Sequence, residues 1–195
     1  MRLHCVSAVL LFGIWLVETQ RQDSTRVPES SGSAVVQATV ALIQNSGIFP
    51  DDHQLLRRIA WVESKDGTDS GTYRQGYHGG IWQVDVIGFR DTQNTTAHPG
   101  FDAKFREIQQ EFGIDWPSVQ WEDLRKPLYS GLATRLFLSN VVESIPFASD
   151  VAGQASYWKT YYNTNLGAGT PETFIEDVMA LENGKSLIRH VNNMD

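Results

Sequence analysis

Apolar residues recur at steps of three and four over most of the chain, which is the spacing of one face of an α-helix. The first such stretch begins near Ser33 and predicts a helix that Gly47 can terminate. Its apolar positions are Val35, Val36, Val40 and Ile43. A second helix is expected after Pro50, because Asp51 or Asp52 is a suitable N-cap. Its apolar positions are Leu55, Leu56, Ile59 and Val62.

Helical spacing returns after residue 100 and predicts four further helices. Their apolar positions are Phe101, Phe105, Ile108 and Phe112; Leu128, Leu132 and Leu136; Val151, Ala155 and Trp158; and Phe174, Ile175, Val178 and Leu181. Thr170 is a suitable N-cap for the last of them, with Pro171 in the first turn. Residues 64–80 are instead rich in Gly, Asp, Thr and Tyr. The predicted class is therefore mainly α (α+β), with a small β-hairpin or loop insertion.

The N-terminal segment has a pattern of its own. Arg2 precedes an apolar run over residues 6–17, and polar residues follow, which is typical of a signal peptide cleaved after Thr19. The run is too short to span a bilayer, which takes about 20 residues. The expected boundaries are a signal peptide at residues 1–19, a flexible leader at 20–32 and one domain at 33–195. Cys5, the only cysteine, falls within the signal, so we expect a secreted protein without disulfides or a membrane segment.

Glu63 continues the apolar stripe of the second predicted helix, four residues after Ile59 and seven after Leu56. A carboxyl group on an apolar face is desolvated, which raises its pKa and lets it hold a proton near neutral pH. That is what a general acid requires. The alternative is that the helix simply ends here and the Glu63 side chain is solvated, as most glutamates are.

Three short motifs follow in order along the chain. They are Glu63-Ser64 with Gly67 behind it, the segment Gly79-Gly80-Ile81-Trp82-Gln83-Val84-Asp85, and Tyr161-Tyr162-Asn163 with Gly167 behind it. Over roughly residues 55–178 this order resembles the lysozyme-like superfamily, in particular goose-type lysozymes and soluble lytic transglycosylases. The resemblance implies a lysozyme-like fold and an enzyme that cleaves β-1,4 glycosidic bonds of peptidoglycan.

The resemblance also implies roles for individual residues. Glu63 is the expected catalytic acid, and Ser64 lies beside it at the substrate. Gly80 and Gln83 are expected in the substrate groove, where Tyr162 and Asn163 support the acid or a sugar. Trp82, where the family has a smaller or more flexible apolar residue, is a departure from the pattern.

Asp85 has two interpretations of equal weight. In the goose-type pattern a carboxylate at this place helps to position a water, and inverting hydrolysis places the two carboxyl groups about 6.5–9.5 Å apart. Aspartate is also a common turn and cap residue, in which case Asp85 points away from the cleft. Asp66 and Asp69 are weaker candidates for the same role.

Aromatic side chains offer flat faces on which pyranose rings stack. The chosen sugar platforms are Tyr73, Tyr77, Trp82 and Tyr162. Trp61, Trp116 and Trp158 lie on apolar stripes and are expected in the core. His53 and His78 have no partners at ligand spacing, so neither a metal nor another cofactor is predicted.

The formal net charge of −7 makes nucleic acid an unsuitable partner. It also repels anionic polymers such as bacterial walls, which favours a neutral glycan or an acidic working pH. The expected partner is a polysaccharide substrate, peptidoglycan or a chitin-like polymer, and the protein is expected to be a monomer. A chitin- or chitosan-cleaving enzyme on the same scaffold and a catalytically silent glycan-binding protein are the two alternatives.

Overall fold

The computed structural model describes residues 22–164 and 167–192, and within them all regular secondary structure is helical, without strands. The helices are α1 (Ser33–Asn45), α2 (Leu55–Ser64), α3 (Val86–Asp91), α4 (Phe101–Phe112), α5 (Pro127–Leu138), α6 (Val151–Tyr157) and α7 (Pro171–Asn192). Shorter helical segments are η1 (Ser24–Arg26), η2 (Trp116–Ser118), η3 (Trp121–Arg125) and the π-helical η4 (Trp158–Asn163). The prediction of a mainly α protein is confirmed.

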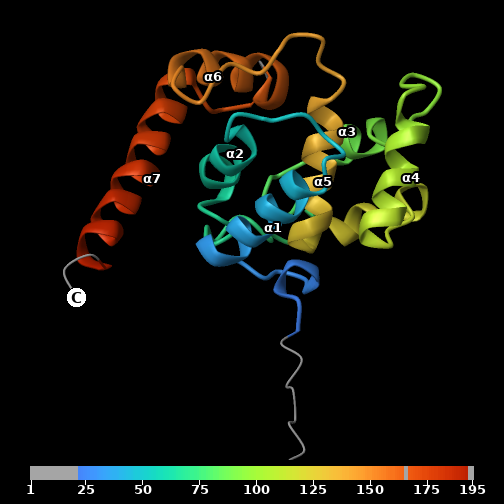
Figure 1. Cartoon of the computed structure of the whole chain (residues 1–195), viewed down its shortest axis with the longest axis horizontal. Coiled ribbons are helices and arrows are strands. Elements are labelled where there is room, and N and C mark those ends of the chain that lie inside the picture. The colour runs from blue at the N-terminus through green and yellow to red at the C-terminus, as the bar shows by residue number, and fades with distance from the viewer. Residues whose placement is uncertain (1–21, 165–166, 193–195) are drawn as a thin grey trace, which may run out of the picture.

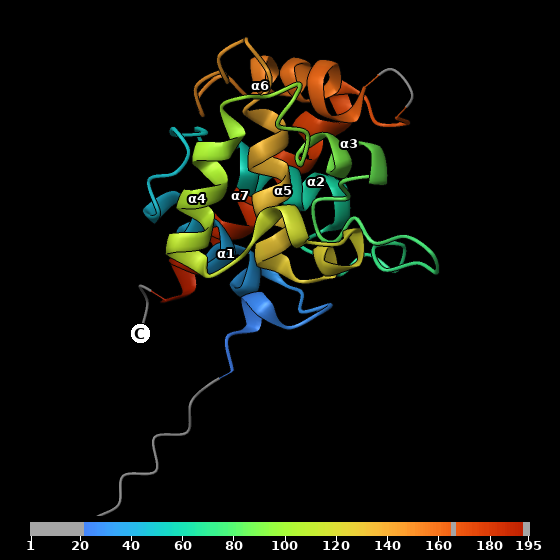
Figure 2. The ribbon, with the colours of Figure 1, turned by 90° about the vertical axis from the view of Figure 1, so that its right-hand side faces the viewer.

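Helix α5 runs through the middle of the molecule, and α1, α2 and α3 all pack against it (Figure 2). Its residues Leu128, Leu132 and Leu136 are fully buried, because the whole helix is surrounded by other elements. In Figure 1, α7 descends along one side of the molecule beside α2, and α6 lies across its upper end. Phe174 and Val178 fix that arrangement by burying the inner face of α7.

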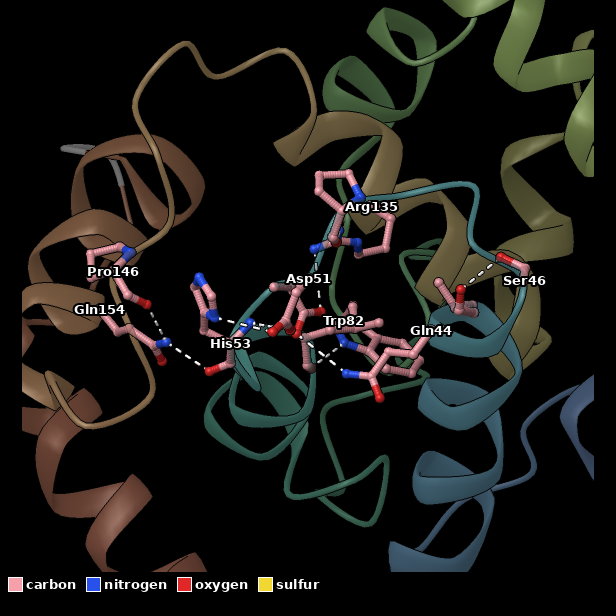
Figure 3. Close-up of polar contacts among 12 residues, drawn as sticks. Gln44, Ser46, Asp51, His53, Trp82, Arg135, Pro146 and Gln154 are labelled. Carbon is pink, nitrogen blue, oxygen red and sulfur yellow. Dashed lines mark hydrogen bonds and ion pairs between the residues drawn. The ribbon is translucent and has the colours of Figure 1, made fainter.

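Buried polar side chains tie the start of α2 to α5 and α6 (Figure 3). Gln154 is fully buried, and its Nε2 donates hydrogen bonds of 2.9 Å to the backbone oxygens of His53 and Pro146. Arg135 donates to the backbone oxygen of Pro50 at 2.5 Å and pairs with Asp52 at 3.2 Å. The turn ahead of α2 is thus held by side chains from two distant helices, and α2 begins at Leu55 behind Gln54 rather than behind an aspartate N-cap.

The structure differs from the expected β-hairpin at residues 64–80: Ser64 ends α2, and residues 65–80 form a succession of turns. Lys65, Asp66 and Gly67 have positive φ angles of 50°, 63° and 82°, so the chain reverses direction directly after α2. The side chains of Ser64 and Asp69 then accept hydrogen bonds from backbone N–H groups of this segment at 2.8 Å each. These local hydrogen bonds satisfy backbone groups within the loop. The segment is therefore a loop insertion, which the sequence analysis left open as the alternative to a hairpin.

The segment expected as a flexible leader is packed where the structure describes it, from residue 22 onward. Thr25 in η1 is buried, and Arg26 donates a 2.8 Å hydrogen bond to the backbone oxygen of Phe112. The backbone N–H of Glu29 donates to the oxygen of Arg125, and that of Gly32 to the oxygen of Asp66, each at 2.8 Å. Segment 22–32 therefore belongs to the folded unit. The sequence did not predict this, because the segment has no apolar periodicity.

The signal-peptide prediction and Cys5 fall on residues 1–21, which lie outside the described part of the chain. Among the residues that the structure does describe, none of the helices is both long and apolar enough to cross a bilayer.

Candidate functional site

A cleft of about 530 Å³ opens between the end of α2, the loop ahead of α3, α3 itself, α5 and η4. The residues that line it are Glu63, Tyr77, Gln83, Val84, Asp85, Ile87, Gly88, Asp91, Phe137, Tyr162, Asn163 and Thr164. Its volume is in the range of clefts that bind small ligands or a few sugar rings. Six residues predicted from the sequence meet here: Glu63, Tyr77, Gln83, Asp85, Tyr162 and Asn163.

Glu63 is the second-last residue of α2 and reaches the cleft from the apolar face of that helix. Its Oε1 accepts a 2.8 Å hydrogen bond from the indole Nε1 of Trp158. Burial raises the pKa of Glu63 from 4.5 to about 7, while the Trp158 hydrogen bond and the charge of Lys65 act in the opposite direction. A carboxyl group with this pKa carries a proton in a large share of molecules at neutral pH.

Tyr162 stands beside the acid as a neutral wall of the cleft. Its hydroxyl donates a 2.6 Å hydrogen bond to the backbone oxygen of Trp82, and its ring meets Phe137 edge to face with centroids 5.8 Å apart. Burial, and secondarily the charge of Glu63, holds the pKa of Tyr162 well above its usual value. Tyr162 thus remains a phenol next to a titrating carboxyl.

Asn163 ends the π-helical segment and is fixed by Lys159. The Lys159 ammonium donates to Asn163 Oδ1 at 3.0 Å and to the backbone oxygens of Thr164 and Gly167 at 2.8 and 2.9 Å. The π-helix itself changes the phase of the side chains after α6, a feature that often marks functional sites. Periodicity reasoning missed it, because a single π turn leaves no recognisable spacing in the sequence.

Gln83 and Tyr77 line the cleft from the loop ahead of α3, where they also hold the loop together. Gln83 has a positive φ of 55°, and its Nε2 donates to the oxygens of Gly80 and Thr72 at 2.6 and 3.1 Å. Arg74 donates to Gln83 Oε1 at 2.8 Å and lies 3.6 Å from the centre of the Tyr77 ring. The amide of Gln83 is therefore engaged by protein groups, and Tyr77 is the aromatic face that this wall presents.

Four predicted substrate-binding residues lie outside the cleft lining. Trp82 is fully buried, and its indole donates to the backbone oxygen of Leu56 at 2.8 Å, so its prediction as a sugar platform is wrong. Ser64 is buried and donates to the backbone oxygen of Ala60 at 3.1 Å. Tyr73 is half-buried and its hydroxyl faces the backbone oxygen of Ser30 at 3.4 Å, away from the cleft.

Gly80 is the fourth predicted substrate-binding residue outside the cleft lining, and packing requires a glycine at this position. Its φ of 66° lies in the left-handed region, and a Cβ atom there would collide with the backbone oxygen of Leu124 and with the Ser130 side chain. Gly80 thus lets the loop approach α5 closely and sets the position of the neighbouring Gln83.

Asp85 caps α3, as one of its two interpretations required. Its Oδ1 accepts a 2.7 Å hydrogen bond from the backbone N–H of Gly88, yet the exposed side chain still borders the cleft.

Asp91, at the other end of α3, is a lining carboxylate that the sequence did not single out. Its Oδ1 lies 3.0 Å from Nε2 of His98, and its Oδ2 accepts from Asn140 at 3.2 Å. The cleft therefore holds two carboxylates besides Glu63.

The weaker candidates Asp66 and Asp69 take structural roles outside the cleft. Asp66 is buried and forms a two-pronged ion pair with Arg57, with N–O distances of 2.6 and 2.7 Å. Asp69 is exposed and accepts a hydrogen bond from Gly71 within its turn.

The core assignment of the tryptophans is confirmed for Trp116 and Trp158, whereas Trp61 is partly exposed. What the sequence did not reveal is that Trp158 also contacts Glu63. Over the described residues, no group of three or more His, Cys, Asp or Glu side chains is arranged to hold a metal ion.

Comparisons of the chain with known protein families, with curated proteins and with solved structures gave no match.

Proposed function

We propose that the protein is a secreted enzyme that cleaves β-1,4 glycosidic bonds, with Glu63 as the general acid. The observation that carries this proposal is a carboxyl group with a pKa of about 7 on the wall of an open cleft. A general acid works best when its pKa lies near the operating pH. The lysozyme glutamate shifted to roughly 6 by an apolar pocket is an established example of the same principle.

The cleft offers surfaces that suit sugars. Tyr77, Phe137 and Tyr162 present aromatic groups, and Ile87 is 76% exposed at the rim. Such faces pack against the apolar faces of pyranose rings, while carboxylate and amide groups bind hydroxyls. These features support glycan binding and, together with the Glu63 acid, favour catalysis over a catalytically silent binding protein.

In the proposed reaction, Glu63 donates its proton to the oxygen that leaves as the bond between C1 and that oxygen breaks. In hydrolysis, a water then attacks C1 and passes a proton to a second carboxylate, for which Asp85 and Asp91 are the cleft's candidates. In the transglycosylase route, a hydroxyl of the substrate attacks C1 and passes its proton to the carboxylate of Glu63, which has just given up its own proton, so that an anhydro product forms. The second route requires neither aspartate.

Peptidoglycan is the substrate that the motif resemblance favours, and one observation supports a chitin-like alternative. Among the described residues that line the cleft, Glu63, Asp85 and Asp91 are acidic, and none is a lysine or arginine. A negative cleft disfavours the carboxylates of peptidoglycan and tolerates neutral or cationic amino sugars.

Mass spectrometry of the products tests the proposal. The purified protein is incubated with peptidoglycan and, separately, with chitin and chitosan oligomers between pH 4 and 8. Anhydro-muropeptides would establish a transglycosylase, and new reducing ends a hydrolase of whichever polymer is cut. If no polymer is cleaved although the protein binds it, the enzyme proposal fails and the glycan-binding function replaces it.

Substitutions of Asp85 separate its cap from a catalytic role. Asp85→Ala is expected to lower the free energy of unfolding by about 1 kcal/mol, because the N-cap bond to Gly88 is lost. Asp85→Ser keeps a cap and removes the carboxylate, so it should retain most of that stability. Urea unfolding and rate measurements on both variants check this. A rate loss above tenfold in the Ser variant would assign Asp85 to water activation, and a near-normal rate would leave Asp91 as the candidate.

A further inference from the structure

We propose that Trp158 is a positioning residue for Glu63: its indole N–H keeps Oε1 as an acceptor, so that Oε2 is the oxygen that carries and delivers the proton. The inference rests on the proposed role of Glu63 as an acid. The hydrogen bond on which it depends is nevertheless measurable without any substrate.

The argument begins with the chemistry of the two groups. An indole N–H can only donate, and a protonated carboxyl group has one O–H and one carbonyl oxygen. With Trp158 Nε1 at 2.8 Å from Glu63 Oε1, the favoured protonated form has its carbonyl oxygen at Oε1 and its hydroxyl at Oε2. Oε2 has no hydrogen-bond partner in the part of the chain that the structure describes, and Glu63 lines the cleft. The proton is thereby assigned to the oxygen that remains available to a substrate.

The donor is held rigidly. Trp158 is 1% exposed, and its ring packs on Phe174 with centroids 5.2 Å apart. Gly169 lies so close to the ring that a Cβ atom there would collide with it. Trp158 is also the first residue of the π-helical segment, which carries Tyr162 and Asn163 into the cleft. One local distortion of the helix thus places the donor and the cleft wall together, and a preorganised donor is what a catalytic carboxyl needs for a fixed orientation.

Other charged and titratable groups also act on Glu63. Lys65 at the end of α2 favours the carboxylate, whereas Tyr77 and Tyr162 would oppose it only if they ionised. Asp85 and Asp91 border the same cleft from the N-cap and the last residue of α3, and their negative charges disfavour a third carboxylate there. Burial raises the pKa of Glu63, and among the groups that lower it Trp158 has the largest effect. Its removal should therefore raise that pKa.

The test is Trp158→Phe, together with the sulfur isostere of tryptophan, benzothienylalanine, at the same position. The isostere preserves the ring shape and lacks the N–H. A carboxyl ¹³C NMR titration follows Glu63, whose signal is assigned by its loss in Glu63→Gln. We expect its pKa to rise by about one unit in both variants, because a hydrogen bond to a charged acceptor is stronger than one to a neutral acceptor. The alkaline limb of any pH–rate profile should move upward with it, and kcat should fall more than KM rises.

Trp116→Phe is the matched control. Trp116 is also fully buried, and its indole donates to the Thr92 hydroxyl at 3.2 Å, but it neither lines the cleft nor bonds Glu63. It should leave the Glu63 titration unchanged. An unchanged pKa in the isostere variant would overturn the inference, even if the protein cleaves glycans. A raised pKa would support it, even if no glycan is cleaved and the enzyme proposal fails.

Discussion

Replacing Glu63 by glutamine is expected to reduce glycan cleavage by about 10²–10⁴-fold, the usual contribution of a general acid. Glutamine has the same shape and retains a carbonyl oxygen that can accept the Trp158 N–H, but it has no proton to give at neutral pH. Initial rates of product release from the polymer that the wild-type protein cuts, measured for both proteins, check this. The wild-type rate should itself fall as pH rises through about 7, because the acid form is then lost.

Stability provides the control for that substitution. The pKa of Glu63 is about 7 in the folded protein and near 4.5 in the unfolded chain, so ionisation of Glu63 costs folding free energy as pH rises from about 4.5 to 7. Glutamine removes this cost. We therefore expect Glu63→Gln to be more stable than the wild type by about 3 kcal/mol at pH 8 and equally stable near pH 4. A stable variant that has lost its activity cannot owe that loss to misfolding, whereas a fully active variant would refute the acid role.

The helices were predictable because their signal is local. The apolar spacing that predicted α1, α2, α4, α5, α6 and α7 is the same spacing that each helix buries. Glu63 was found in this way, since a carboxyl that continues an apolar stripe must lie at the edge of the core. α3 was missed, because its six residues span fewer than two turns and show no periodicity.

The remaining parts of the site depend on contacts that no local pattern records. Trp158 and Glu63 are 95 positions apart, and an apolar stripe predicts burial of an indole without predicting what its N–H meets. Trp82 shows the opposite error: it belongs to a cleft motif, but its side chain points into the core. Asp91 becomes a candidate only when the fold places it in the cleft lining, where His98 and Asn140 contact its carboxylate. Sequence motifs therefore located the cleft, and tertiary packing decided which side chains face it.

Asp66→Asn is expected to lower the free energy of unfolding by about 3–5 kcal/mol, although Asp66 does not line the cleft. Asp66 and Arg57 are 1% and 6% exposed, and the substitution leaves the Arg57 guanidinium buried without its counter-charge. Asparagine suits the left-handed φ of 63° at this position, so the loss should report the ion pair rather than backbone strain. Urea unfolding followed by circular dichroism, with the m-value checked for constancy, measures it.

Two further variants test whether the buried ion pair is the cause. Asp177→Asn removes a surface partner of Lys65, whose ammonium lies 2.6 Å from Asp177, and should cost no more than about 1 kcal/mol. Adding Arg57→Met to Asp66→Asn removes the uncompensated charge and should recover a substantial part of the loss. The Asp66 backbone closes α2 through its N–H to Ala60 and accepts from Gly32, so this pair anchors the turn that follows Glu63. If Asp66→Asn and Asp177→Asn cost the same, the turn is held by its backbone bonds, and the acid is positioned without help from the buried charge pair.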